Sequence, residues 1–388
     1  MTEIREYCAR GILRPDGSVQ RGGALQVEGG RVARAVTRAA TDAVDLGDVL
    51  LTPTFVNAHC HLELSGFAGA LPRDAGFGAW VRALMRLREA ASPNELKQAA
   101  RRGARRLMET GCALVHDIDT TGAGAQALLE ESIDAVVYRE AIDAGDAARR
   151  AQCLADLERP IGLRAQLTEG ISPHAPYTCS SDLLRGLADL ARRRNLPLTM
   201  HWAETLDEVR YLRDGDGPLA DILPPSPRKS GLELIEEAGL LAPDLTLTLV
   251  HGNHPEPGDY ARLAAADVAL VHCPGTHAFF DRGPFDARAA LQAGVRLLLG
   301  TDSLASNDDL NLAAELRGLL ETGALDFDQA WTAATAGGEL PGSVRISAWE
   351  YEGEQRSLED LVREGASPQV LDFSSHAGAP RTRYSVDP

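Results

Sequence analysis

The chain has 388 residues, and its 44% hydrophobic content is enough for one large enzyme domain with an added piece, or for two domains. Its 56 acidic and 39 basic side chains give a formal net charge of -17, which argues against a nucleic acid partner but leaves a free nucleoside open. The N-terminus has no apolar signal core, and no apolar stretch reaches about 18 residues, so we expect a soluble, cytoplasmic protein without a membrane partner.

In chain order, residues 24–36 alternate around a Gly-Gly turn and predict a β-hairpin. The apolar run Val49–Val56 then predicts a buried strand, which leads into His59-Cys60-His61. Because side chains alternate along a strand, His59 and His61 project to the same side and can share one metal ion. The alternative is a pair of histidines that only pack or hydrogen-bond at a strand end.

Strand-like and helix-like segments then alternate along most of the chain. Residues 96–109 and 181–194 have helical spacing, and the second segment opens with serines that can cap it. Eight alternations of strand and helix predict a closed parallel (β/α)8 barrel with its site at the C-terminal rim. The eight apolar runs cover residues 50–56, 113–115, 135–137, 162–167, 197–200, 246–250, 268–271 and 296–299.

Three later strand ends carry further side chains that can bind a metal. His201, His251 and Asp302 each come just after an apolar run, where a parallel sheet or barrel presents its loops. Singly, each signal is weak, because Asp302 can be a helix cap and His251 a core histidine bonded to backbone. Four strand ends that carry His-x-His, His, His and Asp in chain order are a specific pattern for a metal site.

The same residues carry a resemblance to a known group of enzymes. The chain resembles the amidohydrolase superfamily, and within it the cytosine, guanine and adenosine deaminase-like branch. The resemblance spans about residues 50–310. It rests on six words in the right order: Pro53-Thr54-Phe55-Val56-Asn57-Ala58-His59-Cys60-His61, Ser172-Pro173-His174-Ala175-Pro176-Tyr177-Thr178-Cys179-Ser180, His201-Trp202-Ala203-Glu204-Thr205, Val250-His251-Gly252, Val271-His272-Cys273-Pro274 and Gly300-Thr301-Asp302-Ser303.

The resemblance implies the same α/β fold as the strand pattern, a (β/α)8 TIM-type barrel. It adds a small β-sandwich built from both chain ends. We therefore expect residues 1–50 to form the N-terminal part of the sandwich, residues 51–340 the metal-dependent barrel, and residues 341–388 a C-terminal segment. Relatives usually carry a Gly-Lys-x-Ala-Asp-Leu word before the last sandwich strands, and residues 339–388 contain none. Whether the C-terminal segment completes the sandwich is left open.

The lysines bear on the number of metals. Binuclear relatives bridge two ions through a carbamylated lysine at the end of the fourth strand, whereas this chain has only Lys97, in a predicted helix, and Lys229, in a Pro-rich loop. The sequence therefore favours one divalent transition metal. Three imidazoles and a carboxylate suit zinc, with iron and nickel also open. The expected ligands are His59, His61, His201 and Asp302.

Glu204 lies three residues after His201, where the branch keeps its proton shuttle. The resemblance implies that Glu204 takes a proton from the attacking water and delivers it to a ring nitrogen, helped by a cation that lowers the pKa of water. His251 would orient the nucleophile, and Asp302 would pass a proton to the leaving ammonia. The alternative for Glu204 is a solvated loop carboxylate.

The signals for substrate contacts are weaker. His174 resembles the histidine that contacts the purine in S-adenosylhomocysteine and methylthioadenosine deaminases, and Glu89 falls where these enzymes keep a glutamate for the ribose hydroxyls. Arg139, at the end of the third strand, would present a guanidinium fork that suits a substrate carboxylate. The alternatives are a turn histidine, an exposed helix face, and an ion pair of Arg139 with Glu140 or Glu169.

Two words narrow the resemblance further. His-Leu-Glu-Leu-Ser at residues 61–65, and a His-x-x-Phe pattern from His277 to Phe280 after Cys-Pro, look like the aminodeoxyfutalosine deaminases of menaquinone biosynthesis. Gly275-Thr276 departs from their usual Arg-Ser. These enzymes convert the adenine group of 6-aminodeoxyfutalosine to its 6-oxo form, and the resemblance implies the same reaction here, with His277 among the substrate contacts.

Other functions stay open at this point. Methylthioadenosine, S-adenosylhomocysteine or adenosine would keep the mechanism and change the tail, and a triazine hydrolase can use the same kind of site. A barrel that only binds a ligand would need Glu204, His251 or Asp302 to be missing, and all three are present. A homo-oligomer is also left open.

Overall fold

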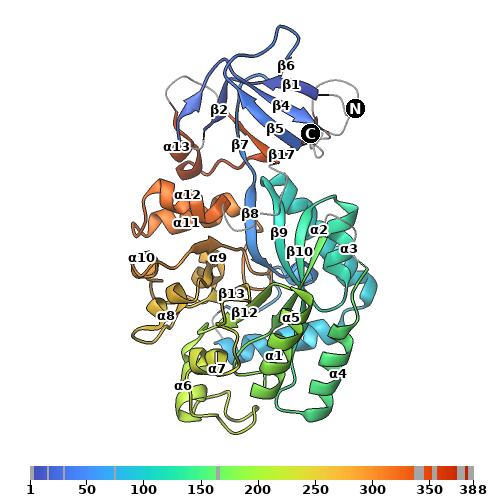
Figure 1. The fold of residues 1–388 in the computed structure, drawn as a ribbon, viewed down its shortest axis with the longest axis vertical. Coiled ribbons are helices and arrows are strands. Elements are labelled where there is room, and N and C mark those ends of the chain that lie inside the picture. The colour runs from blue at the N-terminus through green and yellow to red at the C-terminus, as the bar shows by residue number, and fades with distance from the viewer. Residues whose placement is uncertain are drawn as a thin grey trace. The chain divides into compact units, whose positions relative to one another are not determined.

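A computed structural model describes residues 4–14, 17–28, 31–73, 76–162, 167–335, 345–351, 356–373 and 381–382. The chain divides into two compact units (Figure 1). Unit 1 comprises residues 1–57, 105–114 and 310–388, and unit 2 comprises residues 58–104 and 115–309. All residues expected to bind metal or substrate belong to unit 2.

An eight-stranded sheet forms the barrel, with its strands in chain order from β8 to β15. The pairings from β10 to β15 are parallel, and an isolated parallel bridge between Cys60 and Asp302 joins the end of the first strand to the segment after the last. The predicted (β/α)8 barrel is therefore confirmed. Its strands are β8 Phe55–Cys60, β9 Cys112–Asp119, β10 Asp134–Ala141, β11 Leu167–Pro173, β12 Leu198–Trp202, β13 Leu247–His251, β14 Ala269–His272 and β15 Leu297–Leu299.

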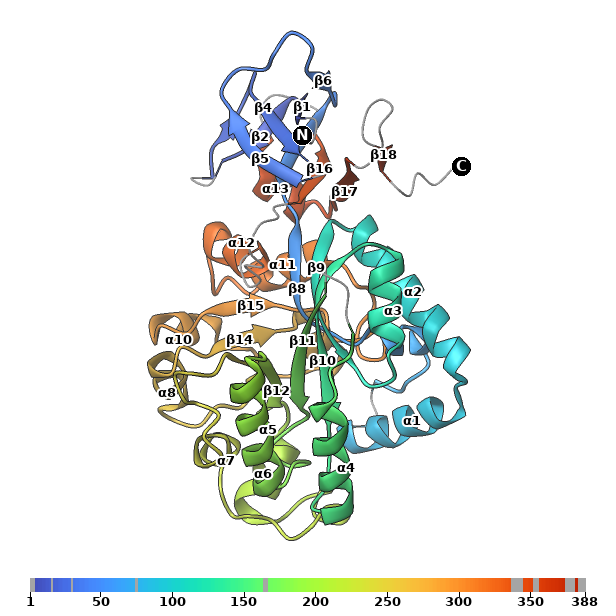
Figure 2. The same cartoon turned by 45° about the vertical axis from the view of Figure 1, so that its right-hand side comes forward.

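Helices lie around these strands in both ribbon views (Figures 1 and 2). The helix predicted at residues 181–194 is confirmed as α5, whose first turn is capped by the Ser180 side chain and whose last turn is closed by Asn195 in the left-handed conformation. The elements between the barrel strands are η1 Leu62–Phe67, α1 Phe77–Ala90, α2 Pro93–Glu109, α3 Ala123–Glu130, α4 Ala147–Glu158, α5 Ser181–Arg194, α6 Leu206–Asp214, α7 Gly231–Glu237, α8 Asp259–Ala265, α9 Pro274–Phe279 and α10 Ala287–Gln292.

Alternation along the strands separates an apolar layer from a polar one. Ala58, Val250 and Val271 belong to a buried apolar cluster. The neighbouring positions His59 and His251 point to the other side of their strands, where polar side chains gather. The sequence pattern of the strands thus aims the histidines into the barrel rim.

The last strand approaches the first closely at Gly300. A Cβ at this position would lie 2.9 Å from both the Cβ and the carbonyl oxygen of His59, so only glycine fits without displacing backbone. The next two residues, Thr301 and Asp302, donate their backbone N–H groups to the His59 carbonyl at 3.1 and 3.0 Å. This contact brings Asp302 to the first histidine.

Unit 1 contains two sheets, with strand orders β5-β4-β1-β6 and β18-β17-β16-β7-β2-β3. Apolar side chains from both sheets meet in one buried cluster, so the predicted small β-sandwich is present: Ile12, Leu25, Leu51, Ile346 and Leu371. The unit is built from β1 Ile4–Cys8, β2 Gly11–Leu13, β3 Val19–Gln20, β4 Ala24–Glu28, β5 Arg31–Val36, β6 Val44–Asp45, β7 Val49–Pro53, α11 Leu312–Glu321, α12 Phe327–Thr335, β16 Ile346–Glu350, α13 Leu358–Arg363, β17 Gln369–Asp372 and β18 Arg381–Thr382. The predicted hairpin at residues 24–36 is the antiparallel pair β4 and β5.

The C-terminal segment contributes strands to this sandwich although it lacks the Gly-Lys-x-Ala-Asp-Leu motif that is usual in relatives. Strand β16 pairs antiparallel with β7. Trp349 on β16 is fully buried, and its Nε1–H donates to the Thr52 hydroxyl at 3.0 Å. Pairing with β7, apolar packing and one buried indole hydrogen bond therefore tie this segment to the sandwich.

Within the described ranges, none of the helices combines the length and the apolar character that crossing a bilayer requires.

Candidate active site

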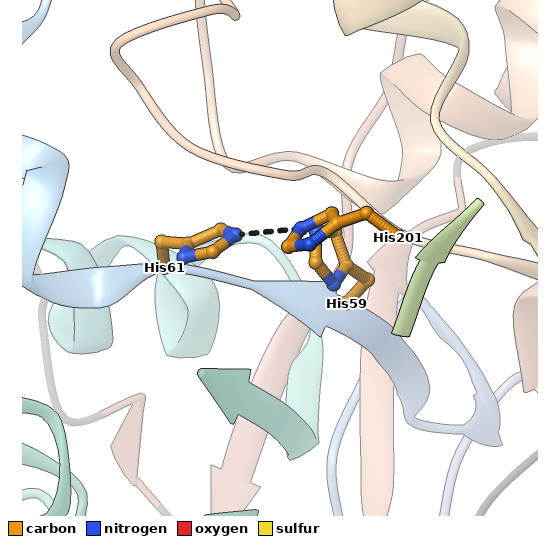
Figure 3. Close-up of side chains that lie close together, drawn as sticks. All are labelled: His59, His61 and His201. Atoms are coloured by element: carbon orange, nitrogen blue, oxygen red, sulfur yellow. Dashed lines mark hydrogen bonds between the residues drawn. The ribbon is translucent and has the colours of Figure 1, made fainter. Parts of the chain in front are cut away.

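Three histidines from two strand ends form the centre of the site (Figure 3). His59 lies on β8, His61 follows it directly, and His201 lies on β12. The Nε2 atoms of His61 and His201 are 3.3 Å apart, and the two rings are nearly parallel, whereas the His59 ring stands almost perpendicular to both. Three imidazole nitrogens thus converge on one point from different directions.

Asp302 completes the set of four expected metal ligands. Its Oδ1 lies 3.6 Å from the Nε2 of His59 and 3.8 Å from the Nε2 of His61. Zinc bonds of about 2.0–2.1 Å in a tetrahedron place neighbouring ligand atoms about 3.3 Å apart, so separations of this size fit one ion of that class. The donor set of nitrogen and carboxylate oxygen also fits a divalent transition metal.

A backbone carbonyl fixes the proton of His201. The Nδ1 of His201 lies 2.8 Å from the carbonyl oxygen of His174, which can only accept, so Nδ1 carries the proton and Nε2 keeps its lone pair. Ligating histidines commonly have an outer partner of this kind, which sets the tautomer and the ring orientation. The arrangement presents the Nε2 of His201 to the centre of the site.

Burial and mutual contact set the charges of these groups. Burial lowers the pKa of His59 and holds the pKa values of His61 and His251 well below the ordinary histidine value. Burial would by itself raise the pKa of Asp302, but hydrogen bonding and charge interaction with His59 hold that pKa well below its usual range. Neutral imidazoles and an ionised carboxylate are the forms that bind metals.

Two of these residues have backbone conformations that are rare for side chains with a Cβ. His251 has φ of 74° and Asp302 has φ of 54°, both in the left-handed region. Such conformations persist where the surrounding structure imposes them, and they are common at functional sites. The backbone here is held so that both side chains face the cluster.

Glu204 lies beside the cluster, just after β12. Its Oε2 is 3.9 Å from the Nε2 of His251, and its Oε1 accepts a hydrogen bond of 2.8 Å from the Nη2 of Arg282. The turn that carries it is held by the buried carboxylate of Glu208, which accepts from the N–H groups of Ala203 and Glu204 at 2.9 and 2.8 Å. Glu204 is therefore a positioned carboxylate and not a solvated one.

Arg282 and Glu208 were not expected from the sequence. Arg282 lies in an irregular segment after α9, where no periodic pattern points to the site. Glu208 lies three residues after Thr205, a spacing typical of a capping box. Its side chain instead reaches further back, to the turn before the cap.

On the other side of His201, the structure adds a carboxylate to the predicted His174. The His174 ring is 4.9 Å from the His201 ring, and its Nδ1 lies 2.8 Å from the Thr178 hydroxyl. One side-chain oxygen of Glu140 and one ring nitrogen from each of His174 and His201 all lie within 4.8 Å of one another. Alternation along β10 from the inward Tyr138 was the signal that could have found Glu140.

Arg139 has structural partners in this structure. Its guanidinium donates to the Glu169 carboxylate at 3.0 Å and to the backbone carbonyls of Asp156 and Arg159 at 2.7 and 2.8 Å. These bonds favour the ion-pair alternative over a contact with a substrate carboxylate. The physical reason is strand parity, because Arg139 and the inward Glu140 point to opposite faces.

The structure does not bring the remaining two predicted contacts to the cluster. Glu89 is exposed on α1 and has no polar contact with the cluster within the described residues. His277 uses both ring nitrogens elsewhere, with Nδ1 3.2 Å from the Asn253 Oδ1 and Nε2 hydrogen-bonded to the Gly283 carbonyl. Their roles in substrate binding stay predictions.

The two lysines also lie outside the site. Lys97 is exposed on α2, and the Nζ of Lys229 is bonded to the carboxylate of Glu237 at 2.6 and 2.7 Å. Strand β11, the fourth strand of the barrel, ends at Pro173 and leads into His174. A lysine bridge between two metals has no counterpart at this strand end.

Comparison with protein families matches residues 50–340 to the amidohydrolase family. The chain belongs to the amidohydrolase family. Amidohydrolases are metal-dependent enzymes, and this member is a hydrolase of the class that acts on carbon–nitrogen bonds. Its site offers the imidazole and carboxylate ligands that such an enzyme requires.

Individual relatives of this amidohydrolase include nucleoside deaminases. An aminodeoxyfutalosine deaminase from Deinococcus radiodurans is 35% identical over 304 residues, which cover 71% of this chain and 68% of that protein. A 5-methylthioadenosine/S-adenosylhomocysteine deaminase from Halobacterium salinarum is 30% identical over 356 residues, which cover 87% of this chain and 79% of that protein. The solved structure of aminofutalosine deaminase from Helicobacter pylori, in complex with methylthio-coformycin, has the same fold, with a TM-score of 0.80, 18% identity and coverage of 96% of this chain and 99% of that one.

Proposed function

We propose that the protein is a metal-dependent hydrolytic deaminase, which converts an adenine nucleoside to its 6-oxo product and ammonia. The observation that carries the proposal is Glu204, a buried carboxylate between His251 and Arg282, beside the converging His59, His61 and His201 and the neighbouring Asp302. A carboxylate so placed can transfer protons in a hydrolytic reaction. The adenine nucleosides in the names of the similar proteins support the choice of substrate.

His59, His61, His201 and Asp302 would hold one divalent transition metal, with zinc as the ion that best suits these ligands. When bound, the metal would activate a water molecule by lowering its pKa toward neutrality. One ion is proposed, and not two, because Lys97 and Lys229 lie outside the site.

Four side chains would carry out proton transfer, orient the water and contact the purine. Glu204 would accept a proton at Oε2 from the attacking water and deliver it to a ring nitrogen of the adenine. His251, neutral because burial lowers its pKa, would orient the water with Nε2, which faces the same Oε2. Asp302, which is ionised at rest, would take the remaining proton of the attacking water and pass it to the amino group, which leaves as ammonia. His174, beside His201, would contact the purine.

Among adenine nucleosides, 6-aminodeoxyfutalosine is the proposed substrate, with a role in menaquinone biosynthesis. The His-Leu-Glu-Leu-Ser word at residues 61–65 and the similarity to the Deinococcus enzyme support it. The second candidate is 5-methylthioadenosine or S-adenosylhomocysteine, supported by the Halobacterium relative. The bond from Arg139 to Glu169 favours a structural role for that guanidinium, and its contact with a substrate carboxylate stays a prediction.

Ammonia release across a panel of nucleosides tests the proposal. The panel contains 6-aminodeoxyfutalosine, 5-methylthioadenosine, S-adenosylhomocysteine and adenosine, with the Glu204→Gln variant as the control for contaminating deaminase. We expect the highest kcat/KM for 6-aminodeoxyfutalosine, and release by the variant that is slower by on the order of 10²-fold or more. A preference for another adenine nucleoside would change the substrate and keep the reaction, whereas no release from any of the four would contradict the deaminase itself.

A further inference from the structure

Arg282 is a buried cation that the family resemblance did not point to. Its side chain is 7% exposed, and the Nη2 donates to the Oε1 of Glu204 at 2.8 Å. The guanidinium carbon lies 4.5 Å from the centre of the Phe280 ring, which packs in turn against Trp80 at 5.4 Å. The guanidinium therefore has an aromatic face on one side and the Glu204 carboxylate at its edge.

The hydrogen bonds of Arg282 differ from those of the half-buried Arg194, which also lies in unit 2. Its side chain makes one hydrogen bond within the described residues, the one to Glu204, and its Nη1 is buried without a partner there. Arg194 instead donates to the Glu169 carboxylate and to the Leu157 carbonyl, at 2.7 Å each. A backbone carbonyl thus helps to fix Arg194, whereas the hydrogen bond of the Arg282 side chain within the described residues goes to Glu204.

The two oxygens of Glu204 face different groups. Arg282 holds Oε1, and Oε2 is 3.9 Å from the Nε2 of His251. A glutamate carboxylate rotates freely about its last bond unless something holds one oxygen. A charge-assisted hydrogen bond in a buried site is strong enough to select one orientation.

We propose that Arg282 is a positioning residue for proton transfer, which holds one oxygen of Glu204 so that the other faces His251 and the reacting water. This inference rests on the proposed role of Glu204 as the proton-transferring group. Arg282 acts through Glu204 and takes no part in binding the metal. Without it, the carboxylate keeps its place in the chain but loses its fixed orientation and its buried counter-charge.

The test compares Arg282→Met with Glu204→Gln, the double variant, and Arg194→Met as the matched control. The substrate is the nucleoside that the wild-type enzyme turns over fastest in the panel. Arg194→Met also removes a mostly buried, ion-paired guanidinium, but away from the site. Metal content is measured for every variant, so that a loss of turnover is read at equal loading.

We expect Arg282→Met to lower kcat on the order of 10- to 100-fold at unchanged metal content, since small misplacements of a catalytic group cost this much. KM should change little, and Arg194→Met should keep the wild-type kcat. In the Glu204→Gln background, Arg282→Met should have no further effect, because residues that act through one group are not additive. Added guanidinium should restore part of the kcat of Arg282→Ala.

Several results would overturn the proposal, and they separate its failure from that of the proposed function. If Glu204→Gln turns over normally, the role of Glu204 itself is wrong. If Glu204→Gln is impaired while Arg282→Met keeps its kcat, Arg282 does not position Glu204. An equal further loss in the double variant, or no response of Arg282→Ala to guanidinium, would assign Arg282 an independent structural role.

Discussion

The two flanks of the histidine cluster place their charged side chains differently. On the Glu204 flank, after β12 and α9, Glu204 and Arg282 pair with each other inside the site, and Glu204 faces His251. On the Glu140 flank, at the ends of β10 and β11, Glu140 and His174 are the described residues that face the cluster with a carboxylate or an imidazole. The ion pairs of that flank lie on the outer side of the strands, where Arg139 and Arg194 share Glu169.

This difference separates groups suited to chemistry from groups suited to recognition. On the Glu204 flank, a carboxylate with one oxygen held by Arg282 and the other facing His251 is placed to move protons. On the Glu140 flank, burial raises the pKa of Glu140, and no ion pair of its own neutralises it within the described residues. Such a carboxylate is suited to accept hydrogen bonds from substrate hydroxyls. We therefore expect catalytic defects from changes on the first flank and changes in KM from the second.

The largest effect should come from the centre that both flanks share. His201→Ala or Asp302→Ala should remove both the metal and measurable turnover, because the ligands act as one unit. Metal analysis of the purified wild-type protein should give close to one equivalent of a transition metal, and His254→Ala, a histidine outside the cluster, should keep it. Two equivalents at full occupancy with a modified lysine would contradict the single-metal site.

A smaller effect is expected from Glu204→Gln. This variant should retain its metal and lose on the order of 10²- to 10⁴-fold in kcat, the range typical of general acid–base groups. Asp207→Asn, which removes a carboxylate three residues further along the chain, serves as the control and should keep wild-type turnover. A loss confined to KM would make Glu204 a binding residue and remove the contrast between the flanks.

On the Glu140 flank, Glu140→Gln should raise KM by about 10-fold, as expected for one lost charge-assisted hydrogen bond, with a smaller change in kcat. The same change at the exposed Glu89 should raise KM less. Kinetics with adenosine and with 2′,3′-dideoxyadenosine would locate the contact, since only the first offers ribose hydroxyls. If Glu89→Gln has the larger effect, the position expected from the family resemblance is the correct one.

The smallest effect on activity is expected from Arg139→Met. Because its guanidinium bonds to Glu169 and to two backbone carbonyls, its loss should lower the free energy of unfolding by about 1–3 kcal/mol. Denaturant unfolding measures this change. Values of kcat/KM should stay close to wild type for both carboxylate-bearing and uncharged nucleosides. A loss of kcat/KM for 6-aminodeoxyfutalosine alone would show that Arg139 contacts the substrate carboxylate.

Much of the fold could be predicted from the sequence, because the relevant signals are local. Eight apolar runs separated by helical patterns indicated the barrel, and the serine before residues 181–194 marked the start of α5. The C-terminal part of the sandwich was harder to predict from the sequence. The family word for its C-terminal strands is missing, and β16 is recruited by its pairing with β7, a contact between residues about three hundred positions apart.

The His-x-His word, the strand-end histidines and the aspartate were all recognisable as a possible ligand set from order and spacing alone, because strand ends of a parallel barrel meet at one rim. The residues that contact the substrate could not be identified from order and spacing alone. Choosing between Arg139 and Glu140 required the parity of β10, and a one-residue error reverses which side chain faces the site.

The metal-binding character of the site could be read from the chain alone, since the types of ligand and their order at strand ends are local features. The charged groups around the site depend on contacts between distant segments. Arg282 reaches Glu204 across 78 positions, from an irregular segment with no periodic signal. Glu169 takes up Arg139 and Arg194 from two different elements. Pairings of this kind depend on where loops and helices meet in space, and local sequence patterns carry no record of that.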